Sequence, residues 1–322
     1  MIIISATPQQ ADAILGAMWA VAEAAGPTEI DRGTLVAARR VLFGQGDIAD
    51  KQMPAAIAPT AFAAAVPPVL HDEAMRALIV MALVDGSIDA ARIDSVSAFA
   101  AALGSTDEAV ADLVKAAHGR IEEAKADMIR ANMASITNAP WSGNTTSDVG
   151  AYLLPYQGDK ADPALVARFE ALGTLPEATF GWRFWRHFTK NGYAFPGDPK
   201  GLNILFSIPH DSCHVLADYD TSAEGEMLTS TFTAAMHPRN SMAAHVLPVI
   251  FAWHLGVAFN DVIYEERGGL KPGAFFEAWQ RGAATNTDFF SGHWDFWSVT
   301  RKDIEDVRAE FGIAPRRFGL DA

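Results

Sequence analysis

Two histidines and two acidic residues are the side chains of this sequence best suited to chemistry. His210 and His214 stand four residues apart, Asp211 directly follows the first histidine, and Glu226 comes after eleven further residues. Residues i and i+4 lie on one face of a helix, so the two imidazole nitrogens can share one ion. Asp211 and Glu226 add hard oxygen ligands. The sequence therefore predicts a divalent-metal site with the ligands His210, Asp211, His214 and Glu226.

Two helices must position these ligands. A first helix over residues 199–217 carries the histidines, and a short polar stretch then breaks it. Thr221 is typical of a helix N-cap, with Glu224 three residues later as a capping-box partner, so a second helix is expected to run from Thr221 to Met236. Glu226 lies in the first turns of that helix. From there it can face back onto the histidine pair.

The same residues allow other interpretations. The spacing is similar to the H-E-x-x-H site of zinc peptidases, but Asp211 is one methylene shorter than the glutamate that acts there as base. An H-x-x-x-H pair also arises by chance near helix ends. Cys213 points about 60–100° away from either histidine and is interpreted as a small packed residue rather than a ligand. Two histidines with carboxylates suit zinc and iron(II) equally.

The motif resembles the signature of the ubiquinone-biosynthesis Coq-four family, in which H-D-x-x-H is followed after eleven residues by glutamate. The flanking sequence agrees in order: residues 171–193 resemble a family stretch upstream, and 294–297 with 304–315 resemble its C-terminal ending. The matching residues of the central string are His210, Asp211, His214, Val215, Leu216, Tyr219, Thr221, Gly225 and Glu226. The resemblance covers roughly residues 140–320.

This resemblance implies a role in ubiquinone (coenzyme Q) synthesis, with a divalent metal for which zinc is favoured and iron(II) is an alternative. The expected reaction is removal of the carboxylate at ring carbon one of a polyprenylated hydroxybenzoate, with or without its replacement by a hydroxyl. Expected partners are the polyprenylated precursor, other ubiquinone-synthesis proteins and a membrane surface. The competing hypothesis is a non-catalytic scaffold or prenyl-lipid carrier, which needs an apolar tunnel but no metal.

An all-α fold is predicted throughout, because helical periodicity runs along the chain and no strand-like alternation occurs. Residues 1–135 are predicted to form a bundle of alanine-rich helices. Within them, residues 82–89 resemble the Asp-Gly motif of tellurite-resistance TerB-like domains. Asp89 is expected to cap the next helix and Asp85 to stabilise the turn, although together they could take a cation.

Composition suggests a domain boundary between the two halves. Residues 136–163 are rich in Pro, Gly, Asn, Ser and Thr, as linkers are. We therefore expect a TerB-like helical domain over 1–135, a linker over 136–163, and a metal-binding helical domain over 164–322.

The net charge of −14 argues against nucleic acid as a partner and against binding to anionic lipids through a cluster of basic residues. A single cysteine suits a reducing compartment. The first ten residues lack the basic region of a signal peptide, and the longest apolar stretch, 243–259, is short for a membrane span. A cytoplasmic protein, with peripheral attachment to the inner face of the cytoplasmic membrane as an option, is expected. Its oligomeric state is left open.

Two further groups of residues are candidates for the cavity around the metal. His245 and His254 lie on an apolar helix predicted over 242–264, where a hydrogen-bonded core role is the more common one. Four aromatic residues, Trp182, Trp185, Phe251 and Trp253, could wall an apolar tunnel, although aromatic residues at helical spacing usually form plain core.

Overall fold

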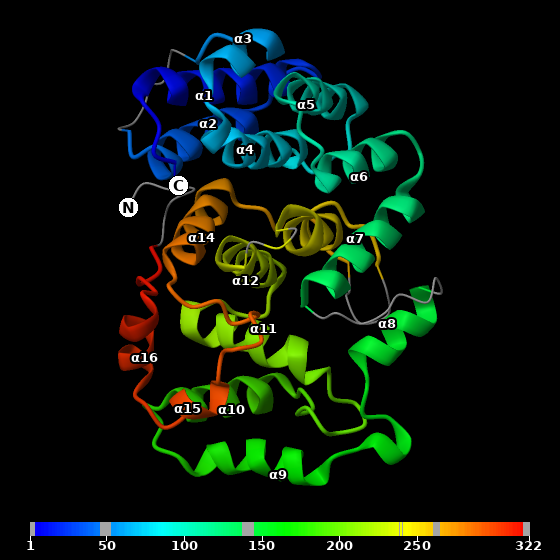
Figure 1. Ribbon diagram of the computed structural model, residues 1–322, viewed down its shortest axis with the longest axis vertical. Coiled ribbons are helices and arrows are strands. Elements are labelled where there is room, and N and C mark those ends of the chain that lie inside the picture. The colour runs from blue at the N-terminus through cyan, green and yellow to red at the C-terminus, as the bar shows by residue number, and fades with distance from the viewer. Residues whose placement is uncertain are drawn as a thin grey trace.

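The structure is a computed structural model that describes residues 4–45, 53–136, 145–237, 239, 241–259 and 265–317. These residues form helices and connecting loops, and the only β pairing among them is two isolated bridges. The predicted all-α fold is confirmed (Figure 1). The first half contains α1 (Pro8–Glu23), α2 (Glu29–Leu42), α3 (Pro59–Ala65), η1 (Pro68–Leu70), α4 (His71–Leu83), α5 (Ala90–Leu103), α6 (Glu108–Ala117), α7 (Ile121–Ile136) and α8 (Thr145–Leu153). The second contains η2 (Gly158–Lys160), α9 (Pro163–Glu170), η3 (Ala171–Thr174), α10 (Phe180–Asn191), α11 (Ile204–Ala217), α12 (Ala223–Met236), η4 (Ser241–Val246), α13 (Leu247–Trp253), α14 (Pro272–Ala284), α15 (Phe296–Val299) and α16 (Ile304–Phe311).

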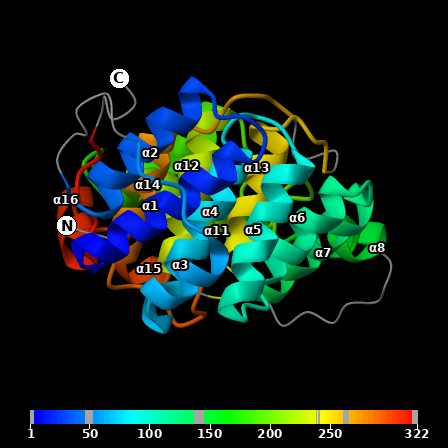
Figure 2. The ribbon, with the colours of Figure 1, turned by 90° about the horizontal axis from the view of Figure 1, so that it is seen from above.

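Helices α12 and α14 form a central layer that is buried on both sides. Above it in Figure 1 lie α1 to α5, and below it lie α9, α10 and α11. Seen from above, α1 to α5 cover α12, α13 and α14 (Figure 2). One hydrophobic cluster joins the upper helices to Met227 of α12 and Trp279 of α14, and a second joins Phe232 of α12 to the lower helices. Nearly all residues of α12 are buried, as expected for a helix that is covered by other helices on both sides.

The close approach of α12 to α14 requires a glycine. A Cβ atom on Gly282 of α14 would lie 2.2 Å from the carbonyl oxygen of Phe232 in α12. No side chain fits there, so glycine at position 282 allows the short distance between α12 and α14. The position of α12, which carries Glu226, depends on this contact.

The packing crosses the boundary that composition suggests. His254 Nε2 lies 3.1 Å from the carbonyl oxygens of Leu83 and Val84, and the Asn132 amide donates to the carbonyl of Ala244 at 2.8 Å. The first hydrophobic cluster likewise contains side chains from both halves. The two-domain division stays a prediction, and any division of this chain must cut through a shared core.

Several helix boundaries differ from the predicted ones. The stretch predicted as linker contains α8, whose Tyr152 is buried. In the first half, Gly119 adopts a positive φ of 81° and separates α6 from α7. The apolar helix predicted over 242–264 is instead a π-helical turn, η4, followed by α13, which ends at Trp253.

The Asp-Gly turn behaves as predicted. Asp89 caps α5 by accepting from the amide of Arg92, and Asp85 accepts from the amide of Ser87. Arg92 is itself buried against Asp31 of α2, with its two terminal nitrogens 2.8 and 2.9 Å from the two carboxylate oxygens. This bidentate pair ties α5 to α2 inside the upper layer. The likeness to TerB-like domains stays a prediction.

Within the described ranges, none of the helices has both the length and the apolar character needed to cross a membrane.

Candidate metal centre and its cavity

A tight turn between α11 and α12 brings the candidate ligands together. Asp218 ends α11 in the left-handed conformation, with φ 61°, and the side chain of Ser222 caps α12 by accepting from the amide of Gly225. The N-cap is thus Ser222 and not Thr221 as predicted, because Asp220 accepts from the amide and hydroxyl of Ser222 and fixes it at the helix start. A Cβ atom on Gly225 would lie 2.1 Å from the carbonyl of Asp220. Glycine before Glu226 is therefore a requirement of this turn.

Two arginines hold the C-terminal end of α11. The last carbonyl groups of a helix have no partner within it. Arg308 donates to the carbonyls of Val215 and Leu216, and Arg281 donates to that of Ala217 and to the hydroxyl of Tyr219. Positive charge at a helix C-terminus is also favourable to the helix dipole. The helix end that carries His214 is therefore fixed from two sides.

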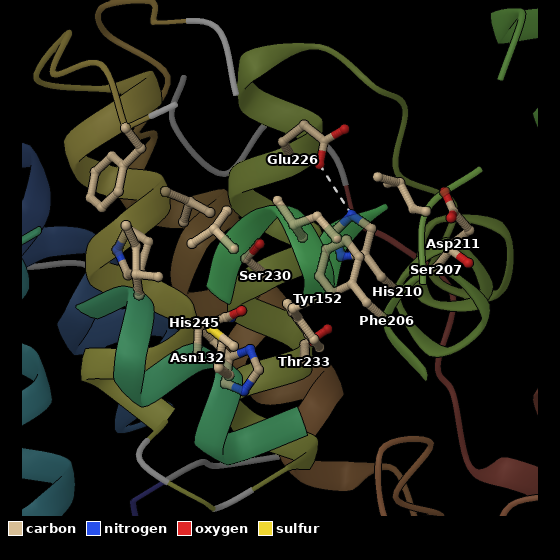
Figure 3. A pocket seen from close by; sticks show the side chains of 18 of the residues that line it. Asn132, Tyr152, Phe206, Ser207, His210, Asp211, Glu226, Ser230, Thr233 and His245 are labelled. Carbon is tan, nitrogen blue, oxygen red and sulfur yellow. Dashed lines mark ion pairs between the residues drawn. The ribbon is translucent and has the colours of Figure 1, made fainter. Parts of the chain in front are cut away.

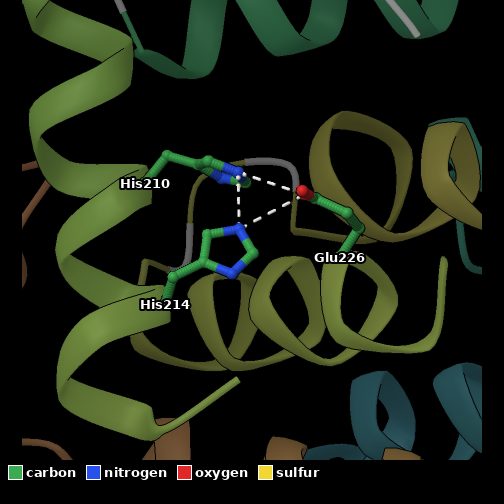
Figure 4. A group of neighbouring side chains, drawn as sticks. All are labelled: His210, His214 and Glu226. Carbon is green, nitrogen blue, oxygen red and sulfur yellow. Dashed lines mark hydrogen bonds and ion pairs between the residues drawn. The ribbon is translucent and has the colours of Figure 1, made fainter. Parts of the chain in front are cut away.

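Three of the four predicted ligands meet in one group (Figure 4). The Nε2 atoms of His210 and His214 are 3.2 Å apart, and each lies 3.3 Å from Oε2 of Glu226. Burial acts to raise the pKa of Glu226, but the charge of His214 and hydrogen bonds from both histidines hold that pKa well below its usual value. Burial would lower the pKa of His214, and the neighbouring Glu226 raises it instead. The group thus presents an ionised carboxylate to two imidazoles.

The ring of His214 has its orientation fixed from behind. Its Nδ1 lies 3.2 Å from the carbonyl oxygen of Tyr219 and 3.0 Å from the hydroxyl of Thr229. A carbonyl can only accept, so Nδ1 carries the proton and donates to it. When Nε2 carries no proton, as a metal ligand requires, its lone pair faces His210 and Glu226, as in metal sites whose histidines are oriented by a backbone carbonyl.

The donor set fits a metal ion. A tetrahedral ion lies about 2.0–2.1 Å from each ligand atom, which places the ligand atoms about 3.3–3.4 Å from one another. The observed separations of 3.2–3.3 Å agree with this, without any movement of the side chains. Two nitrogens and one carboxylate oxygen are also the usual donors of zinc and iron(II) sites that leave a position for substrate.

The structure does not bring Asp211 into this group. Its Oδ1 atom accepts a hydrogen bond from Nε2 of His187 on α10 at 2.9 Å, and both side chains are largely buried. The ring of His187 stacks on that of His214 with centroids 5.3 Å apart. Consecutive residues of a helix point about 100° apart, so Asp211 turns away as His210 turns inward. Asp211 as a direct ligand stays a prediction, and its place supports a role in holding His187 against His214.

The group opens onto an apolar cavity of about 500 Å³ (Figure 3). Its wall comes from both halves and from the stretch predicted as linker. It includes His210, Asp211 and Glu226, together with Met128, Ile129, Asn132, Met133, Val149, Tyr152, Leu153, Phe188, Tyr193, Lys200, Leu202, Phe206, Ser207, Ser230, Thr233, His245, Pro248, Val249, Trp253, Phe259 and Phe290. The volume lies within the range typical of small-molecule sites, and apolar walls with a few polar groups are their usual composition.

The other residues singled out from the sequence lie in different places in the structure. Cys213 is fully buried, and burial raises its pKa to about 12, which confirms it as a packed residue. Of the four aromatic candidates only Trp253 lines the cavity. His254 is a hydrogen-bonded core residue, whereas His245 reaches the cavity. His187 and Thr229 were not predicted, because their roles depend on contacts between helices that are distant in the sequence.

Comparison with known proteins gives little further information. No family model and no curated protein matches this sequence. The chain is similar to a crystal structure of a protein from Nostoc punctiforme PCC 73102 that is provisionally assigned to ubiquinone biosynthesis. The two sequences are 16% identical, the TM-score is 0.31, and the match covers 76% of this chain and 96% of the other.

Proposed function

We propose that this protein acts in ubiquinone biosynthesis as a metal-dependent decarboxylase of a polyprenylated hydroxybenzoate. The observation that carries the proposal is that three metal-type donor atoms, 3.2–3.3 Å apart, stand in the wall of a largely apolar cavity. The motif that holds these donors also resembles that of a family with this role. Neither feature alone would suggest this substrate class.

His210, His214 and Glu226 would hold the ion. A divalent metal there would supply a Lewis acid that binds the substrate carboxylate or an adjacent hydroxyl and stabilises negative charge. The chain's own residues contribute orientation: Tyr219 and Thr229 fix the His214 ring, and the apolar wall excludes water from the reacting ring. In the simple reaction the bond from the ring to the carboxylate breaks, carbon dioxide leaves, the electron pair stays on the ring carbon, and that carbon takes up a proton from the solvent. Replacement by a hydroxyl would require dioxygen and a redox metal such as iron(II).

The apolar part of the cavity supports a substrate with a hydrocarbon tail. Met128 and Met133 of α7 and Val249 of α13 line the same space. Methionine side chains adapt to irregular apolar ligands. Burying each methylene of a prenyl tail there would contribute about 0.8 kcal/mol.

The alternative function is a lipid carrier or scaffold without catalysis. The cavity is common to both hypotheses, and only the donor group separates them. A helical bundle with two extensive hydrophobic clusters has no evident need of a metal for folding, which favours a chemical role for the group.

Single-turnover assays would test the catalytic proposal. The full chain, loaded separately with zinc and with iron(II), is incubated with 3-farnesyl-4-hydroxybenzoate labelled with ¹⁴C in the carboxylate. We expect release of labelled carbon dioxide that is lost in Glu226→Gln and retained in a variant of the exposed, distant His118, His118→Ala. Tight binding of the probe without release by either metal form would favour the carrier function.

A further inference from the structure

A second polar region lies in the cavity away from the metal centre. Glu226, Ser230 and Thr233 follow one another at positions i, i+4 and i+7 of α12, and all three line the cavity. Seven residues of helix rise span about 10 Å, so this face of α12 leads from the metal group toward the far wall. His245 and Asn132 stand there, apart from His210 and Glu226 (Figure 3). The two ends of the cavity are thus both polar, with the hydroxyl groups of Ser230 and Thr233 along α12 between them and apolar side chains around them.

His245 is held in one orientation by Ser135 of α7. Its Nε2 lies 2.8 Å from the hydroxyl oxygen of Ser135, and that hydroxyl donates its only proton to the carbonyl of Arg239 at 3.1 Å. Ser135 must therefore accept from His245, which places the ring proton on Nε2. Nδ1 is left with a lone pair, and no residue in the described part of the chain forms a hydrogen bond with it. A fixed acceptor results on a residue that lines the cavity.

The surroundings of His245 keep that acceptor available. The residue belongs to the π-helical turn η4, a rare conformation that is frequently found at functional sites. Burial, with the nearby His237 and His210, lowers the pKa of His245 to about 3, so the ring is neutral at physiological pH. The ring of Phe290 packs beside it, with centroids 5.9 Å apart.

We propose that Nδ1 of His245 accepts a hydrogen bond from the ring hydroxyl of the substrate, and so selects a phenol whose hydroxyl lies opposite the group held at the metal centre. This inference rests on the proposed function, because it assumes that the carboxylate end of the ring faces His210, His214 and Glu226. His245 is a specificity residue in this arrangement. It transfers no proton and serves to orient the ring.

The separation of the two polar ends favours a single aromatic ring between them. A single ring with polar groups at opposite positions, a metal bond at one end and a hydrogen bond at the other has a total length of about 10 Å. This length is similar to the rise of α12 between Glu226 and Thr233. A methyl ether in place of the hydroxyl would have no proton to offer Nδ1. It would also leave the lone pair of His245 buried without a partner.

Binding of two probes to the zinc-loaded full chain tests the proposal. The probes are 3-farnesyl-4-hydroxybenzoate and 3-farnesyl-4-methoxybenzoate, and their dissociation constants are measured by calorimetry. We expect the wild-type protein to prefer the hydroxyl probe about tenfold. His245→Phe should remove the preference by weakening the hydroxyl probe alone. His245→Asn keeps an acceptor near the position of Nδ1 and should restore part of it.

A second variant acts from outside the cavity. Ser135→Ala removes the partner that fixes the ring of His245, so the preference should fall several-fold while the affinity for the methoxy probe is unchanged. His118→Phe, at a distant exposed position, is the control. An undiminished preference in His245→Phe and Ser135→Ala, or its absence in the wild type, overturns the role of His245 and leaves the proposed function standing. Failure of both probes to bind the wild-type protein would reject the proposed function itself.

Discussion

Asp211 follows His210 directly in the sequence, yet its carboxylate accepts a hydrogen bond from Nε2 of His187 on another helix, at 2.9 Å. His187 in turn stacks on His214. Asp211 therefore lies beside the donor group of His210, His214 and Glu226 and not within it. It fixes the neighbour of a ligand, as residues that support metal ligands commonly do.

The donor group should lose its metal when either histidine is removed. Each of His210→Ala and His214→Ala leaves only two of three protein ligands, so we expect less than a tenth of the wild-type zinc after dialysis, measured by mass spectrometry. His118→Ala, a change of an exposed histidine, should keep full occupancy. Stoichiometric zinc in both ligand variants would show that the ion binds elsewhere.

Asp211→Asn distinguishes a ligand from a supporting residue. Asparagine can still accept from His187 through its amide oxygen, so the variant should retain one zinc per chain, with affinity reduced about 10- to 100-fold. Competition with a fluorescent zinc chelator measures this affinity. Complete loss of zinc, equal to that of His214→Ala, would instead restore Asp211 as a direct ligand.

Glu226→Gln separates enzyme from scaffold in the cell. The change keeps the shape of the side chain and removes the charge that pairs with His210 and His214. If the donor group performs chemistry, a strain with this variant should accumulate a polyprenylated precursor that retains its carboxylate, as measured by lipid mass spectrometry. Normal quinone levels with a stably expressed variant would contradict a catalytic role.

The buried pair of Asp31 and Arg92 should contribute strongly to stability. Both side chains are almost completely buried, and without the charge of Asp31 the guanidinium keeps only the longer ion pair to Asp85, at 3.5 Å. Asp31→Asn should therefore lower the free energy of unfolding by about 3–5 kcal/mol in urea titrations. Glu29→Gln, which changes an exposed partner of Arg32, should alter it by less than about 0.5 kcal/mol. Equal effects of the two changes would show that burial does not decide the contribution.

The same pair predicts a dependence of stability on pH. Burial would raise the pKa of Asp31, but hydrogen bonds from Arg92 and Thr28 outweigh it and lower that pKa below the usual value of 3.8. The stabilisation is therefore complete above about pH 4 to 5 and is lost as the pH falls through the folded-state pKa. The difference in unfolding free energy between wild type and Asp31→Asn should shrink over that acidic range. An unchanged difference down to pH 2 would contradict the assignment.

Separating the two halves of the chain should expose hydrophobic side chains that are buried in the intact protein. The fragment 164–322 lacks the helices that cover Met242, Phe275 and Trp279, so we expect it to aggregate or to lose helical circular dichroism. Co-expression with fragment 1–163 should rescue it. A fragment 164–322 that folds alone would instead support two independent domains.

The sequence by itself determined the helical class, the approximate positions of the two helices that carry the motif, and three residues of the donor group. Helical periodicity is local, and the spacing of His210 and His214 fixes their common face wherever the helix lies. Glu226 could be included because the turn before it is short. These inferences needed no knowledge of distant contacts.

Tertiary structure decided the rest. The side of α11 on which Asp211 finds its partner depends on α10, and the inclusion of His187 and Thr229 depends on packing between helices. The cavity draws its wall from α7, α8 and α13, and His245 gains its role from Ser135, which lies 110 residues earlier in the chain. Such contacts depend on how the hydrophobic faces of many helices pack together. Local sequence patterns do not specify which faces will be in contact.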